Sequence, residues 1–161
     1  MSPTPHDSGA HSGPDSAGRG GLGIVSQTEF DVCLIVDTAS TALGDIEESI
    51  GIKGADGSHE KGAPHIIKSR GVWRTTVWQL SSGCPRTIPL EEQFAAIELR
   101  LAPGRLRMAG TIPTDARVYF SLGIFSDAQV PTANLTPRIL EVAAKYQADI
   151  ELKFYAPDLD G

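Results

Sequence analysis

The order of apolar and polar residues predicts four strands, over residues 29–36, 71–82, 116–125 and 149–155. The alternation is clearest in the third segment, where every second residue from Val118 to Ile124 is apolar. A period of two is typical of a pleated strand with one buried face. In the fourth segment we expect Ile150, Leu152 and Phe154 to point inward. Its outward positions, Glu151, Lys153 and Tyr155, are polar, so we expect a sheet that is solvated on one side.

Three helices are predicted between these strands. Apolar residues recur at helical spacing over residues 43–50 and 89–101, and again after Thr136. Gly51 follows the first helix as a C-terminal stop. Pro89 and Pro137 occupy first-turn positions, and Thr136 supplies the N-terminal cap of the last helix.

The order strand, helix, strand, helix, strand, helix, strand predicts an α+β domain. Residues 29–82 and 116–155 each form a strand–helix–strand unit, with the 89–101 helix as an extra helix between the two halves. Two such units side by side would make a ferredoxin-like split β-α-β sandwich. We therefore expect a four-stranded, mostly antiparallel sheet with its helices mainly on one face.

The segment Gly71–Ser82 holds both tryptophans and does not alternate cleanly. An unbroken strand would place Val72 and Trp78 on the same face as Arg74. A bulge between the two Val-Trp pairs would put both tryptophans on one side. We predict that Trp78 and Leu80 belong to the core.

The chain should form a single domain over residues 29–156. Half of residues 1–28 are Gly, Ser or Pro, so this segment is predicted to be disordered. Residues 157–161 would form a short C-terminal tail. Because no window is long and apolar enough for a membrane span and the start has no secretory pattern, we expect a cytoplasmic protein without a membrane partner.

The formal net charge of −6 argues against nucleic acid as a partner. Two cysteines in 161 residues do not make a disulfide framework. Cys84, in a Ser-Gly-Cys-Pro turn, could act as a nucleophile with His59 or His65, but the turn supplies no activating group.

The glycine-rich, charged loop over residues 52–69 holds the remaining candidate chemistry. His59, Glu60 and His65, with Asp56, are weak candidates for metal ligands, and a solvated loop is the simpler interpretation. We predict no cofactor. The basic residues around Trp73 indicate instead a binding patch for an acidic partner, against the simpler interpretation of ordinary surface charge. Its members are Lys61, Arg70, Trp73 and Arg74.

Several short motifs, in this order, resemble the uncharacterised bacterial "domain of unknown function 4279" family over residues 29–156. That resemblance implies a compact α+β fold and no established activity. The motifs are Gly51-Ile52, Lys61-Gly62, Trp78-x-Leu80-x-Ser82, Leu90-Glu91-Glu92 and Ile150-x-Leu152-x-Phe154-Tyr155.

The leading functional hypothesis is a non-catalytic binding module for a protein partner, for example in the manner of an immunity protein. It would use the loop before Trp73 and the open face of the sheet, which presents Tyr119 and Tyr155. The alternative is a small hydrolase or transferase with a weak metal site over residues 56–65. The chain could be a monomer, or a homodimer joined through an edge strand or the solvated sheet face.

Overall fold

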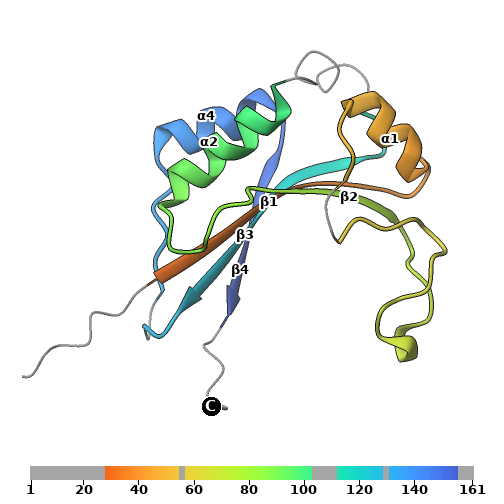
Figure 1. The fold of residues 1–161 in the computed structure, drawn as a ribbon, viewed down its shortest axis with the longest axis horizontal. Coiled ribbons are helices and arrows are strands. Elements are labelled where there is room, and N and C mark those ends of the chain that lie inside the picture. Colours follow the sequence, from red (N-terminus) through yellow and green to blue (C-terminus); the bar gives the residue numbers. More distant parts are fainter. Residues whose placement is uncertain (1–27, 55–56, 103–111, 129–130, 156–161) are drawn as a thin grey trace, which may run out of the picture.

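The computed structural model describes residues 28–54, 57–102, 112–128 and 131–155. The predicted disordered tail lies outside the described residues except for Thr28, and residues 157–161 and Asp56 also lie outside them. The elements follow the predicted order (Figure 1). They are β1 (Thr28–Thr38), α1 (Leu43–Ile50), the 3-10 turn η1 (Lys68–Arg70), β2 (Thr76–Ser81), α2 (Leu90–Leu101), β3 (Arg117–Ser126), α4 (Pro137–Lys145) and β4 (Asp149–Tyr155).

The four strands form one mixed sheet in the order β2-β1-β3-β4. β1 is antiparallel to both of its neighbours, and β3 and β4 run parallel. The predicted α+β class and mostly antiparallel sheet are therefore confirmed.

The ferredoxin-like arrangement is not confirmed. It requires the first two strands to be parallel and separated, whereas β1 and β2 are adjacent and antiparallel. β2 and β3 are instead the parallel pair with a strand between them, and α2 connects them. The 89–101 helix, predicted to be an extra helix, is therefore α2, the crossover helix between β2 and β3. Among the described strands, β2-α2-β3 is the only strand–helix–strand unit whose parallel strands have another strand between them.

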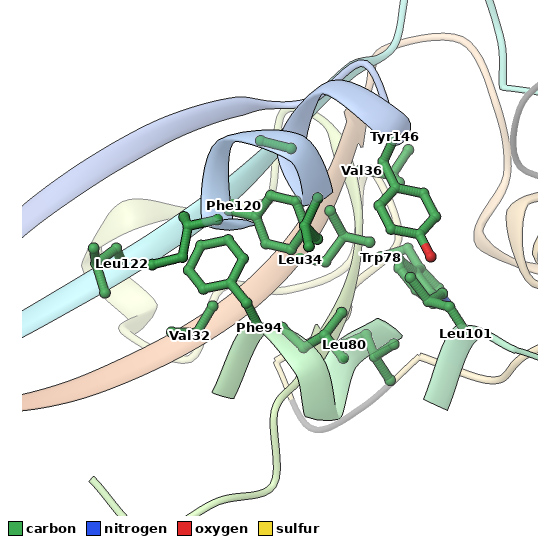
Figure 2. Close-up of a cluster of buried hydrophobic side chains, with 14 of the residues drawn as sticks. Val32, Leu34, Val36, Trp78, Leu80, Phe94, Leu101, Phe120, Leu122 and Tyr146 are labelled. Carbon is green, nitrogen blue, oxygen red and sulfur yellow. The ribbon is translucent and has the colours of Figure 1, made fainter. Parts of the chain in front are cut away.

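The helices α1, α2 and α4 all contribute apolar side chains to one core on one face of the sheet. Figure 2 shows Phe94 and Leu101 of α2 together with core side chains of β1, β2 and β3. Phe94 of α2 and Phe120 of β3 lie at the centre of this core, with ring centroids 4.7 Å apart. Glu98 of α2 forms ion pairs with Arg138 and Lys145 of α4, which join the two helices at the surface. Within the described residues, no helix has the length and apolar character of a membrane span.

The helix ends follow the predicted signals. Gly51 takes a left-handed conformation, φ 78°, and its N–H bonds to the Glu47 carbonyl to end α1. The Thr136 hydroxyl accepts a hydrogen bond from the Ile139 N–H, with Pro137 in the first position of α4. These local choices fix where each helix begins or ends.

The prediction of one strand over Gly71–Ser82 was wrong for its first half. β2 begins at Thr76, and a bend at Arg74 and Thr75 separates it from Trp73. Trp78 and Leu80 are fully buried in the core, as predicted. The bend removes the conflict in the hydrophobic pattern, because Arg74 no longer shares a strand face with Trp78.

β4 matches the predicted bounds but not the predicted burial. Ile150 packs against the core, whereas the side chains of Leu152 and Phe154 are 41% and 57% exposed. β4 is an edge strand, so these side chains have strand neighbours on one side only. The apolar face of β4 is therefore left partly uncovered.

Candidate functional site

Residues 57–75 form an arm that projects away from the helices beside β2 (Figure 1). Its two sides are held together by backbone hydrogen bonds, including those from Trp73 N–H to the Ala63 carbonyl (3.0 Å) and from His65 N–H to the Gly71 carbonyl (2.9 Å). At its base His59 bridges Val77 of β2 through two backbone hydrogen bonds. Most of the loop that was predicted over residues 52–69 is thus the first side of an irregular hairpin.

Trp73 lies between the two histidines of the arm. Its ring centroid is 3.7 Å from that of His59, nearly parallel, and 3.9 Å from that of His65, tilted by 35°. Two rings at these distances must occupy opposite faces of the indole, since one face has room for only one stacked ring.

Each imidazole also has a backbone partner. His59 Nδ1 lies 3.0 Å from the Gly57 carbonyl oxygen, to which it donates, and His65 Nδ1 accepts a hydrogen bond from the Ile67 N–H at 2.9 Å. The His65 contact holds the chain where it turns into the tip of the arm. The stack and these two bonds give the arm a defined shape without a buried core of its own.

The predicted metal ligands do not converge. His59 and His65 are separated by the indole, and the Glu60 carboxylate accepts a hydrogen bond from Leu43 N–H at 2.8 Å. That bond caps α1, whose own N-cap residue, Ala42, has no side-chain oxygen. In the part of the chain that the structure describes, no three His, Cys, Asp or Glu side chains are grouped to hold a metal ion.

Lys61 joins the arm to the body of the protein. Its ammonium group donates to the Ala39 carbonyl at 2.9 Å. The adjacent Ser40 hydroxyl, together with that of Thr38, bonds to the Asp115 carboxylate and lowers the Asp115 pKa. Of the predicted binding residues, Lys61 thus has a structural role at the base of the arm.

The tip of the arm, residues 66–72, exposes three apolar side chains. Ile66, Ile67 and Val72 are 89%, 49% and 56% exposed. Lys68 and Arg70 are exposed between them in η1. Neither isoleucine was predicted as a binding residue. Two adjacent β-branched residues in a glycine-rich loop, outside any periodic element, are a signal that could have indicated them.

The arm is basic although the protein is acidic. It contains four Lys or Arg residues and one Glu, whereas the whole chain has a formal net charge of −6. Arg70 at the tip and Arg74 at the bend are both exposed, and Trp73 is half-buried in the stack. The structure therefore places all four predicted binding residues on one arm, with Arg70 nearest the exposed isoleucines.

The open face of the sheet offers less free surface than predicted. Tyr119 lies there but is only 9% exposed, and the Arg117 guanidinium covers its ring at 4.5 Å. The ring of Tyr155 stacks on Phe125 with centroids 4.7 Å apart, and Arg86 covers the other side of Phe125 at 3.8 Å. The Tyr119 ring is thus covered by the protein's own side chains, whereas Tyr155 is 46% exposed.

The two cysteines differ in their surroundings. Cys33 is buried on the open face of the sheet, and burial, followed by the charge of Asp31, raises the pKa of its thiol. Cys84 is partly exposed in the turn after β2. Because the thiolate is the reactive form, Cys33 should react more slowly than Cys84.

We expect one thiol to react rapidly with an aromatic disulfide reagent at pH 8 in the folded protein, and the second only after unfolding. The Cys84→Ser variant should lose the rapid phase, and Cys33→Ser should keep it. Absorbance at the wavelength of the released thiolate follows both phases. Loss of the rapid phase in Cys33→Ser would show that the buried thiol is accessible and contradict this assignment.

Comparison of the chain with protein-family models, with curated proteins and with solved structures gave no match. The resemblance to the bacterial domain family accordingly stays a prediction from the motifs.

Proposed function

We propose that the protein is a cytoplasmic protein-interaction module whose contact surface is the tip of the arm. The observation that carries the proposal is the exposure of Ile66, Ile67 and Val72 around two basic side chains. Exposed apolar side chains grouped with polar neighbours are typical of protein-binding sites. Leu99 on α2 is also strongly exposed, but its neighbours along the chain, Glu98 and Arg100, are charged and not apolar.

The charge of the arm indicates the chemistry of the partner. Lys68 and Arg70 flank the apolar side chains, and the single acid of the arm, Glu60, lies at its base and is bonded to Leu43 N–H. A partner with an apolar centre and an acidic rim would complement this tip. Opposite charges at the rim would accelerate association and make the rate depend on salt.

The arm is also ordered before binding. The His59–Trp73–His65 stack and the bond from Ile67 N–H to His65 set the direction of the tip. Preorganised contact residues lose less conformational entropy on association. The alternative of a hydrolase or transferase has no comparable support. Among the described residues, the indole of Trp73 separates His59 from His65, and the Glu60 carboxylate is bonded to Leu43 N–H.

A photo-crosslinking amino acid at position 66 should capture one acidic protein in the native host. The same amino acid at position 99 is the matched control, because Leu99 is also strongly exposed, at 76%, but lies outside the arm. The captured partner should then bind the purified protein in calorimetry. Capture of the same proteins from both positions, or of none, would contradict the proposal.

The Ile66→Asp variant should bind that partner at least about tenfold more weakly, a loss of about 1.4 kcal/mol. Leu99→Asp should bind as the wild type does. Both sites are exposed, so both variants should unfold within about 0.5 kcal/mol of the wild type. Unchanged affinity in Ile66→Asp would remove the tip from the interface.

A further inference from the structure

One edge of β4 is free of strand partners within the part of the chain that the structure describes, where β4 pairs with β3 alone. The opposite edge strand, β2, is bridged by His59 of the arm. Unpaired N–H and C=O groups along such an edge can accept another strand. We propose that β4 pairs in antiparallel fashion with β4 of a second copy of this chain, so that two sheets join into one of eight strands.

The apolar residues of β4 fit this pairing. Across an antiparallel pair, opposite residues lie on the same face. With Leu152 on the two-fold axis, each Leu152 faces its counterpart and each Ile150 faces Phe154 of the second copy. The two apolar side chains that the helices leave uncovered, Leu152 and Phe154, would then gain contacts across the new strand boundary.

The charged residues of β4 fit the same register. With Leu152 on the axis, Glu151 lies opposite Lys153 of the second copy, and the symmetry repeats the pair. Within one chain the carboxylate of Glu151 lies 3.4 Å from the ammonium group of Lys153 and 3.0 Å from the Arg117 guanidinium. Arg117 also pairs with Asp149 at 3.6 Å, so the charges of these four side chains balance before the copies meet.

The neighbouring registers are disfavoured. A shift that keeps apolar residues on the apolar face moves the axis to Glu151 or to Lys153. Either axis places a charge directly opposite its own counterpart, which is unfavourable. The strand is thus self-complementary in one antiparallel register, and this argues for a second copy rather than a different protein as its partner.

Pairing through β4 would leave both arms free. β2 is the far edge of each sheet, so the two arms would stand at opposite ends of the joined sheet, about 34 Å apart across seven strand spacings. The dimer is independent of the proposed role of the arm.

Sedimentation of the full chain across a range of concentrations should show a reversible equilibrium between the 17.1 kDa monomer and a species of twice that mass. In the Lys153→Glu variant, positions 151 and 153 both carry a negative charge. In the Glu151→Lys variant, both carry a positive charge. Each variant alone should dimerise at least about tenfold more weakly, because both Glu–Lys pairs become like-charge pairs. An equimolar mixture of the two should form heterodimers, because opposite charges face each other again.

Three outcomes would overturn the proposal. They are a wild type that stays monomeric at millimolar concentration, single variants that dimerise as tightly as the wild type, and a mixture that stays monomeric. Circular dichroism confirms that each variant is folded. Phe154→Lys, at an exposed position, provides a second variant that should also weaken the dimer at least about tenfold.

Discussion

Replacing Trp78 by alanine should lower the free energy of unfolding by about 4 kcal/mol. The indole is fully buried among side chains of the core, and its N–H donates to the Ile52 carbonyl at 3.2 Å (Figure 2). Truncating a buried tryptophan removes its transfer free energy and leaves a cavity, with a typical cost of about 3–5 kcal/mol. Urea denaturation followed by circular dichroism measures the change.

The other tryptophan is the matched control. Trp73→Ala removes an indole of the same size, but from the arm, where its partners are two imidazoles. Aromatic pairs contribute about 0.5–1.5 kcal/mol each, so the two pairs together should contribute about 1–3 kcal/mol, and we expect a smaller loss than for Trp78. Equal losses in the two variants would show that the arm unfolds together with the core and does not behave as a separate unit.

Replacing Gln93 by leucine should cost about 3 kcal/mol, although leucine is apolar and similar in size. Gln93 is fully buried at the start of α2. Its amide nitrogen donates to the carbonyls of Phe30 (2.9 Å) and Ile88 (3.1 Å), and its amide oxygen accepts from the Ser82 hydroxyl at 3.2 Å. The variant leaves the Phe30 and Ile88 carbonyls without their amide donor and the Ser82 O–H without its acceptor, and a buried group left unsatisfied costs about 1–3 kcal/mol.

Glu92→Leu is the control for this prediction. Glu92 is the preceding residue on the same helix but is exposed, and its carboxylate lies in the first turn. Its loss should cost under about 1 kcal/mol. If Gln93→Leu were as stable as Glu92→Leu in urea denaturation, the amide would not be what holds β1 and the 82–88 segment to α2.

The burial of Gln93 and the shape of the arm could not be predicted from the local sequence pattern. A buried glutamine has no local signature, because its partners are Phe30, 63 positions before it, and Ile88 in the preceding turn. The Trp73 stack likewise depends on a hairpin closed between His59 and Val77. Nothing in the local pattern states that residues 71–75 pair with the loop rather than continue β2.

Where neighbours in sequence decide the outcome, the prediction was accurate. The bounds of β4, the Thr136 cap of α4 and the Gly51 end of α1 all follow from side chains within a few residues. The burial of Trp78 and Leu80 follows from the period of two once the strand starts at Thr76.

The α+β class and the order of the helices and strands were thus predictable from the amino-acid sequence alone. The strand order β2-β1-β3-β4, the closure of the arm around Trp73 and the exposed edge of β4 became evident only in the folded protein. These two groups of features differ in the range of the contacts that set them. Periodicity and capping are set within one turn or one strand, whereas strand order and edge exposure depend on contacts between distant segments.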